Sequence, residues 1–217
     1  MRLTLTFMAV LSAISMAVLG NFYQVTAPKI GNSVIAPKTS KQLGGSGLAF
    51  AIPNGITDHQ YDLLNSAYRI ARDNGLKHPE ILQGIVFQET HAGALDSYRV
   101  AGQEFGLKTN ERYYGICQIK LKAARDVLKA HPELLEKYDF HTNTDEEVIA
   151  NLILNDDFNL EIASLYLKII ADNYGNGKEF MIAAFNKGPG GAKNVDVGSL
   201  DYVKKVKQYI AKFSKAK

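Results

Sequence analysis

Three short segments carry the side chains that could do chemistry. Residues 86–90 read Val-Phe-Gln-Glu-Thr, residues 114–119 read Tyr-Gly-Ile-Cys-Gln-Ile, and residues 183–190 read Ala-Ala-Phe-Asn-Lys-Gly-Pro-Gly. They supply one carboxylic acid, Glu89, and two neutral amides, Gln118 and Asn186. An acid beside neutral hydrogen-bonding groups suits proton transfer to a departing oxygen, while the amides orient a polar substrate.

Glu89 continues an apolar stripe made by Leu82, Ile85 and Val86 at helical spacing. Burial on such a face disfavours the carboxylate form, so it raises the pKa of the acid. A glutamic acid that stays protonated near neutral pH is the group that general-acid cleavage of a glycoside requires. The alternative is a glutamate at a helix end that simply reaches solvent.

The three segments resemble the motifs of the goose-type lysozyme and soluble lytic transglycosylase superfamily. Those motifs read Glu-Ser, Gly-Leu-Met-Gln-Ile, and Ala-Tyr-Asn followed by Gly-Pro-Gly, and the resemblance spans roughly residues 57–209. It implies an all-α, lysozyme-like domain that cleaves the MurNAc-β-1,4-GlcNAc bond of peptidoglycan and leaves 1,6-anhydroMurNAc ends. It also implies that Glu89 acts first as acid and then as base, without metal or cofactor.

The same resemblance implies a glycan cleft with substrate-binding residues at Thr90, Tyr114, Gln118, Phe185 and Asn186. Three positions depart from the family motifs. Thr90 replaces a serine, and Cys117 replaces a methionine and is interpreted as a packing residue. Phe185 replaces a tyrosine whose hydroxyl orients the acid, so Tyr113 and Tyr114 are candidates to supply that hydroxyl instead.

A second carboxylate cannot be assigned from the sequence. Ordinary glycosidases pair two acids. Asp96, Glu104 and Glu111 lie between the first two motifs, but nothing in their spacing selects one of them. A goose-type-like hydrolase that uses a loop carboxylate therefore stays open as an alternative. The Phe185 departure leaves a second one open, a non-catalytic wall-binding adaptor of a secretion or conjugation apparatus. The five histidines lack the spacing of a zinc site.

The N-terminal region predicts export. Residues 1–20 place one arginine before an apolar run, a pattern typical of a secretory signal peptide, with an uncleaved membrane anchor as the alternative. Residues 21–48 are rich in proline and glycine and are interpreted as a flexible linker, which leaves residues 49–217 for the catalytic domain. The protein is thus expected in the periplasm or outside the cell, either free or tethered to the membrane.

The composition indicates the class of partner. The 217 residues are 46% hydrophobic and carry a formal charge of +3, which suits an anionic wall polymer but is far too small to indicate nucleic-acid binding. The expected partners are peptidoglycan glycan strands, together with a secretion, conjugation or phage apparatus.

Helical periodicity and capping signals predict the elements that must position these residues. The pattern predicts helices over 57–75, 79–90, 115–131, 144–153, 160–174, 178–186 and 200–213. Residues 188–191 are expected to form a tight turn, and no run of alternating residues requires a sizeable sheet.

Overall fold

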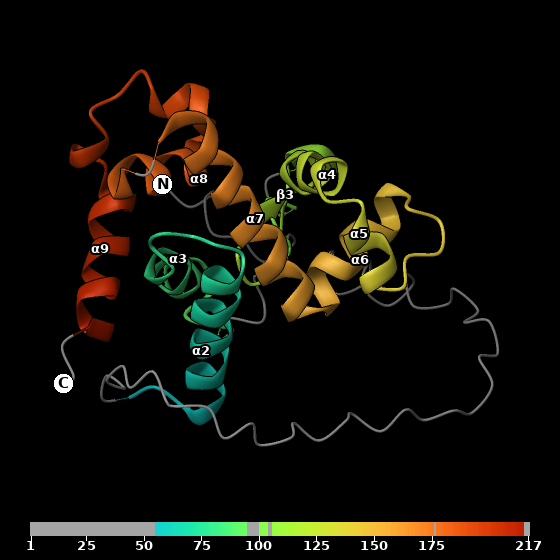
Figure 1. Cartoon of the computed structure of the whole chain (residues 1–217), viewed down its shortest axis with the longest axis horizontal. Helices are drawn as coiled ribbons and strands as arrows, with labels where there is room; N and C mark the ends of the chain where they lie inside the picture. The colour runs from blue at the N-terminus through green and yellow to red at the C-terminus, as the bar shows by residue number, and fades with distance from the viewer. Residues whose placement is uncertain (1–54, 95–99, 104–105, 176, 215–217) are drawn as a thin grey trace, which may run out of the picture. The chain divides into compact units, whose positions relative to one another are not determined.

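Helices dominate the part of the chain that the structure, a computed structural model, describes: residues 55–94, 100–103, 106–175 and 177–214 (Figure 1). The α helices there are α2 (Asp58–Asp73), α3 (Glu80–Thr90), α4 (Leu121–Ala130), α5 (Glu133–Lys137), α6 (Asp145–Leu154), α7 (Asp156–Tyr174), α8 (Lys178–Ala192) and α9 (Asp201–Ser214). Two 3-10 turns, η2 (Thr109–Glu111) and η3 (Val197–Ser199), lie between them. The predicted all-α class is confirmed at this level.

The expected signal peptide over 1–20 and the linker over 21–48 lie outside the described residues, so both stay predictions. Within the ranges that the structure describes, no helix is both long enough and apolar enough to cross a membrane.

The predicted start and stop signals of the first helices are confirmed. Thr57 caps α2 through a reciprocal box: its hydroxyl accepts from the Gln60 backbone N–H at 3.3 Å, and the Gln60 side chain accepts from the Thr57 N–H at 2.9 Å. Gly75 follows the helix at φ +77°, a conformation that favours glycine. Pro79 directly precedes α3, where its fixed φ suits the helix start.

Helix α7 passes through the middle of the helical domain and contacts α2, α4, α6 and α8 (Figure 1). Its side chains are buried on several faces, including Leu160, Ile162, Leu167 and Ile170, each with no exposed surface. Each such side chain contributes about 1.5–3 kcal/mol by leaving water. The sequence pattern predicted this central helix, and Asn155, which accepts from the Phe158 N–H at 3.1 Å, sets its start.

The segment around Gly115 is not the helix start that periodicity predicted. Instead β2 (Tyr113–Tyr114) pairs antiparallel with β1 (Val100–Ala101) and with β3 (Ile119–Lys120), and α4 begins only at Leu121. Gly115 and Gln118 have φ of +71° and +51°, outside the right-handed helical region, so residues 115–118 form a tight turn between β2 and β3.

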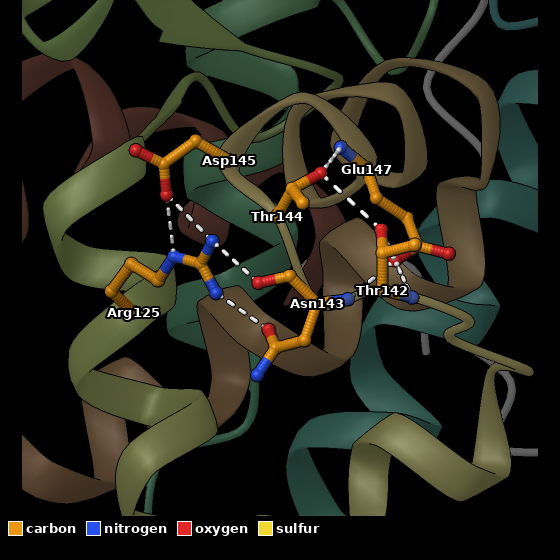
Figure 2. Close-up of polar contacts among 6 residues, drawn as sticks. All are labelled: Arg125, Thr142, Asn143, Thr144, Asp145 and Glu147. Carbon is orange, nitrogen blue, oxygen red and sulfur yellow. Dashed lines mark hydrogen bonds and ion pairs between the residues drawn. The ribbon is translucent and has the colours of Figure 1, made fainter.

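A charged network secures the loop that precedes α6 (Figure 2). The Arg125 guanidinium, on α4, donates to Asp145 Oδ1 at 2.6 and 2.8 Å and to the Asn143 carbonyl at 3.0 Å. The Glu147 carboxylate accepts the backbone N–H groups of residues 141, 142 and 143, at 2.7–2.8 Å, and these bonds lower its pKa to about 2. The predicted Thr144–Glu147 box forms only in part, because the Glu147 side chain turns to these earlier residues. The network holds α6 against α4.

Helices α8 and α9 lie where the sequence predicted them, with one difference in α8. Helix α8 continues past residue 186, but Gly188 breaks it at φ +74° and ψ +156°, so a bend occurs where the glycine-rich turn was predicted.

The sequence pattern missed α5, a five-residue helix that starts after Pro132. Five residues are too few to show helical periodicity.

Candidate active site

Glu89 lies in the last turn of α3, partly buried, at the end of the stripe that contains Leu82, Ile85 and Val86. Burial raises the pKa of Glu89 from 4.5 to about 7, while a hydrogen bond from Tyr202 opposes part of the rise. The C-terminal end of a helix is also its negative end, which further disfavours a carboxylate. The position of Glu89 therefore supports the prediction that this side chain keeps its proton near neutral pH.

Tyr202, in the first turn of α9, is the functional residue that the sequence did not reveal. Its hydroxyl donates to Glu89 Oε1 at 2.5 Å. Burial raises the pKa of the Tyr202 phenol well above its ordinary value, so the hydroxyl remains a donor. The only local signal was its helical spacing with Val206 and Tyr209, a pattern shared by ordinary packing residues. Tyr202 thus supplies the hydroxyl absent at Phe185, a role expected of Tyr113 or Tyr114.

A close approach of two helices brings Tyr202 to the acid. Gly84 on α3 faces α9, and a side-chain carbon added there would lie within 3.0 Å of Val206 and Ile210. The missing side chain lets α9 lie directly against α3, and the two helices are neighbours in Figure 1. Tyr202 and Glu89, 113 positions apart in sequence, therefore share one face of the contact.

Asn159 on α7 holds the loop that carries Gln118. Its amide donates to the carbonyls of Tyr114 and Leu152, both at 3.0 Å, and its carbonyl accepts the Cys117 N–H at 2.9 Å. Asn159 has no exposed surface, and buried bonds of this kind specify one loop conformation because leaving any of them unmade is costly. Gln118 then closes the turn by donating to the Gly115 carbonyl at 2.8 Å.

Cys117 is buried beneath this loop with no exposed surface, as its packing interpretation requires. Burial raises the pKa of its thiol well above the ordinary value, and the neighbouring Glu89 raises it further. The protonated thiol is a poor nucleophile.

Two of the predicted substrate-binding residues lie away from the cleft. Thr90 is only 1% exposed; its hydroxyl donates to the Ile116 carbonyl at 3.0 Å and accepts the Gly93 N–H at 3.2 Å. Tyr114 is 2% exposed and donates to the Thr109 carbonyl at 2.8 Å. Both side chains point inward and join segments of the fold through these hydrogen bonds. Thr90 and Tyr114 are thus supporting residues of the site.

The other predicted residues meet around Glu89. A cavity of about 210 Å³ is lined by Glu89, Ala101, Tyr113, Gln118, Phe185 and Asn186. Apart from the acid, these six described lining residues are uncharged. Such a pocket can protonate a bound oxygen and accept or donate hydrogen bonds to a neutral polar group, because the amides do both. Tyr113, the neighbour of the predicted Tyr114, is the tyrosine that faces it.

Glu89 is the single acid in this lining within the part of the chain that the structure describes. Glu111, one of the three loop candidates, is exposed and accepts the Lys108 N–H at 3.2 Å, which caps η2. Asp96 and Glu104 lie outside the described residues. Among the residues described, no cluster of three or more His, Cys, Asp or Glu side chains is arranged to hold a metal ion.

Comparison of the chain with family models, with curated proteins and with solved structures returns no match.

We expect Tyr202→Phe to shift the alkaline limb of activity to higher pH. The lost hydrogen bond stabilises the ionised carboxylate, so its removal raises the pKa of Glu89 and keeps the acid protonated further into the alkaline range. The measurement is kcat/KM against pH. Tyr209→Phe is the matched control, since Tyr209 on the same helix packs its ring on Phe87. An alkaline limb that stays in place or moves to lower pH would contradict the assigned bond.

Proposed function

We propose that the chain is a peptidoglycan lytic transglycosylase with a lysozyme-like domain. The observation that carries the proposal is the partly buried Glu89, with a pKa of about 7, in a cavity whose other lining residues, among those that the structure describes, are neutral. Cleavage of a glycosidic bond needs an acid that is protonated at working pH, and a pKa near 7 also leaves its conjugate base able to accept a proton.

The first step uses the protonated acid. Glu89 donates its proton to the glycosidic oxygen, the bond from that oxygen to C1 of MurNAc breaks, and the N-acetyl carbonyl oxygen of the same sugar bonds to C1. The departing sugar leaves with a hydroxyl group. This participation of the substrate removes the need for a second protein carboxylate, which fits the uncharged side chains around Glu89 among the described lining residues.

The second step uses the resulting carboxylate. Glu89 accepts the proton of the 6-hydroxyl, O6 bonds to C1, and the acetamide oxygen leaves C1, which produces the 1,6-anhydro end and restores the protonated acid. Tyr202 stabilises the carboxylate between the two steps through its hydrogen bond. Gln118 and Asn186 are the groups suited to hold the acetamide, because each amide both donates and accepts.

The proposed substrate lies outside the cytoplasmic membrane, so the proposal includes export to the periplasm or the cell exterior. The apolar run in residues 1–20 supports this location. Wall turnover and the opening of the wall for a secretion, conjugation or phage apparatus are both compatible with this chemistry.

Mass spectrometry of digested sacculi tests the reaction. We expect soluble muropeptides that end in 1,6-anhydroMurNAc and lack the added water of hydrolysis. Reducing MurNAc ends would instead identify a hydrolase in which a loop carboxylate directs water. Binding of sacculi without any soluble product, measured as turbidity, would identify a wall-binding adaptor that has lost the chemistry.

A further inference from the structure

A second hollow adjoins the cavity of Glu89. It measures about 300 Å³ and shares four lining residues with that cavity, Tyr113, Gln118, Phe185 and Asn186. The hollow continues along the first turns of α4 to the bend after residue 186 of α8. We call it the α4 arm of the cleft. A polymer bound across Glu89 can extend into this arm because the two hollows share one wall.

Charge distinguishes the α4 arm from the pocket of the acid. Three lysines and one aspartate line the arm: Lys120, Lys122, Lys187 and Asp126. Lys122 pairs with Asp126 at 2.9 Å, so their charges offset each other. Lys120 has its ammonium 4.8 Å from the centre of the Tyr113 ring, and neither Lys120 nor Lys187 has an ion pair among the described residues. Among the described residues, these two positive charges remain beside a pocket whose lining, apart from Glu89, is neutral.

We propose that the α4 arm binds a sugar whose side branch ends in a carboxylate, with Lys120 and Lys187 as its partners. This inference rests on the proposed function. The rings of Tyr113 and Tyr166 line the arm and suit the apolar face of a sugar, while the two exposed ammonium groups suit an anionic branch. Peptidoglycan offers such a carboxylate from two sources: the lactyl group of muramic acid, and its peptide stem when one is attached.

The two lysines are suited to binding and not to the proton transfer. A nearby ammonium group would lower the pKa of Glu89, yet the pKa is raised, by burial, and only Tyr202 opposes the rise. Loss of the two charges is therefore expected to weaken substrate binding without moving the pH dependence that Glu89 sets. Weaker substrate binding with an unchanged pH dependence would therefore assign the two lysines a role in specificity and not in catalysis.

The test compares Glu89→Gln with the triple variant that adds Lys120→Met and Lys187→Met. Fluorescence anisotropy would measure the binding of three labelled ligands: a neutral N-acetylglucosamine oligomer, stem-free strands with lactyl carboxylates, and stem-bearing strands. We expect the triple variant to bind a carboxylate-bearing ligand roughly 2- to 30-fold more weakly at low salt, from two exposed charge pairs. Affinity for the neutral oligomer should not change, and high salt should remove the difference.

The pattern of loss identifies the source of the carboxylate. Weaker binding of the stem-free strands alone assigns the lactyl group, and weaker binding of the stem-bearing strands alone assigns the peptide stem. Weaker binding of both shows that the arm accepts either. Lys129→Met is the matched control, because Lys129 is an exposed lysine of α4 that does not line the arm.

Unchanged affinity for all three ligands, or an equal loss for the neutral oligomer, would overturn the inference. Turnover measured on protein that keeps Glu89 distinguishes failure of this inference from failure of the proposed function. If Lys120→Met/Lys187→Met leaves KM unchanged while anhydro ends still form, only the assignment of the arm fails. If wild-type protein releases no anhydro ends and Glu89→Gln binds no glycan, the proposed function fails as well.

Discussion

Replacing Glu89 with glutamine is expected to lower the release of anhydro-muropeptides by at least ~10²-fold while glycan binding persists. The amide keeps the shape of the side chain and accepts the Tyr202 hydrogen bond, but it cannot deliver a proton. Because burial raises the pKa of Glu89 to about 7, the ionised side chain destabilises the folded protein above that pH. The glutamine variant should therefore be at least as stable there as the wild-type protein. Turnover, binding and thermal unfolding measured on one preparation check these expectations.

The loop acids provide the matched controls for this substitution. Asp96→Asn, Glu104→Gln and Glu111→Gln should each have a mild effect if the substrate acetamide takes the place of a second carboxylate. If one of them abolished turnover as completely as Glu89→Gln, with the helical circular dichroism retained, the two-carboxylate hydrolase would replace the transglycosylase. Wild-type activity should also fall as pH rises past the pKa of Glu89, because the protonated acid is then depleted.

Gly115→Ala should destabilise the fold more than any other single methyl addition discussed here. An added carbon would lie closer than 3.0 Å to the Leu152 carbonyl oxygen and to the amide of Asn159, and the φ of +71° is itself unfavourable for alanine. Overpacking costs about 1–3 kcal/mol and the left-handed conformation about 1–2 kcal/mol, so we expect a loss of roughly 3 kcal/mol. That corresponds to a Tm lower by roughly 6–12 °C.

The matched control for Gly115→Ala is Gly190→Ala. An added carbon at Gly190 meets no atom within 4 Å, and its φ is not in the left-handed region. Its Tm should stay near that of the wild-type protein. Equal melting temperatures for the two variants would show that the contacts of Asn159 and Leu152 around Gly115 do not constrain the loop.

The order of the helices and the position of the acid could be predicted from sequence, because both depend on neighbours along the chain. Thr57 with Gln60, Pro79, and Gly175 are local signals, and Glu89 belongs to a stripe that repeats every three or four residues. The same local logic failed at residues 115–118. Apolar spacing there indicated a helix, whereas positive φ angles and two hydrogen bonds with the distant Asn159, at Tyr114 and Cys117, form a turn.

The sequence by itself thus determined that the chain is helical and that Glu89 is an acid on an apolar face, with Gln118 and Asn186 as its amide companions. Only the tertiary structure decided which hydroxyl reaches the acid, because Tyr202 approaches Glu89 across 113 positions through the contact of α3 with α9. It also decided that Tyr113 faces the cavity and Tyr114 does not, since adjacent residues of a strand point to opposite sides. Such choices depend on packing between segments far apart in the chain, for which local sequence carries no signal.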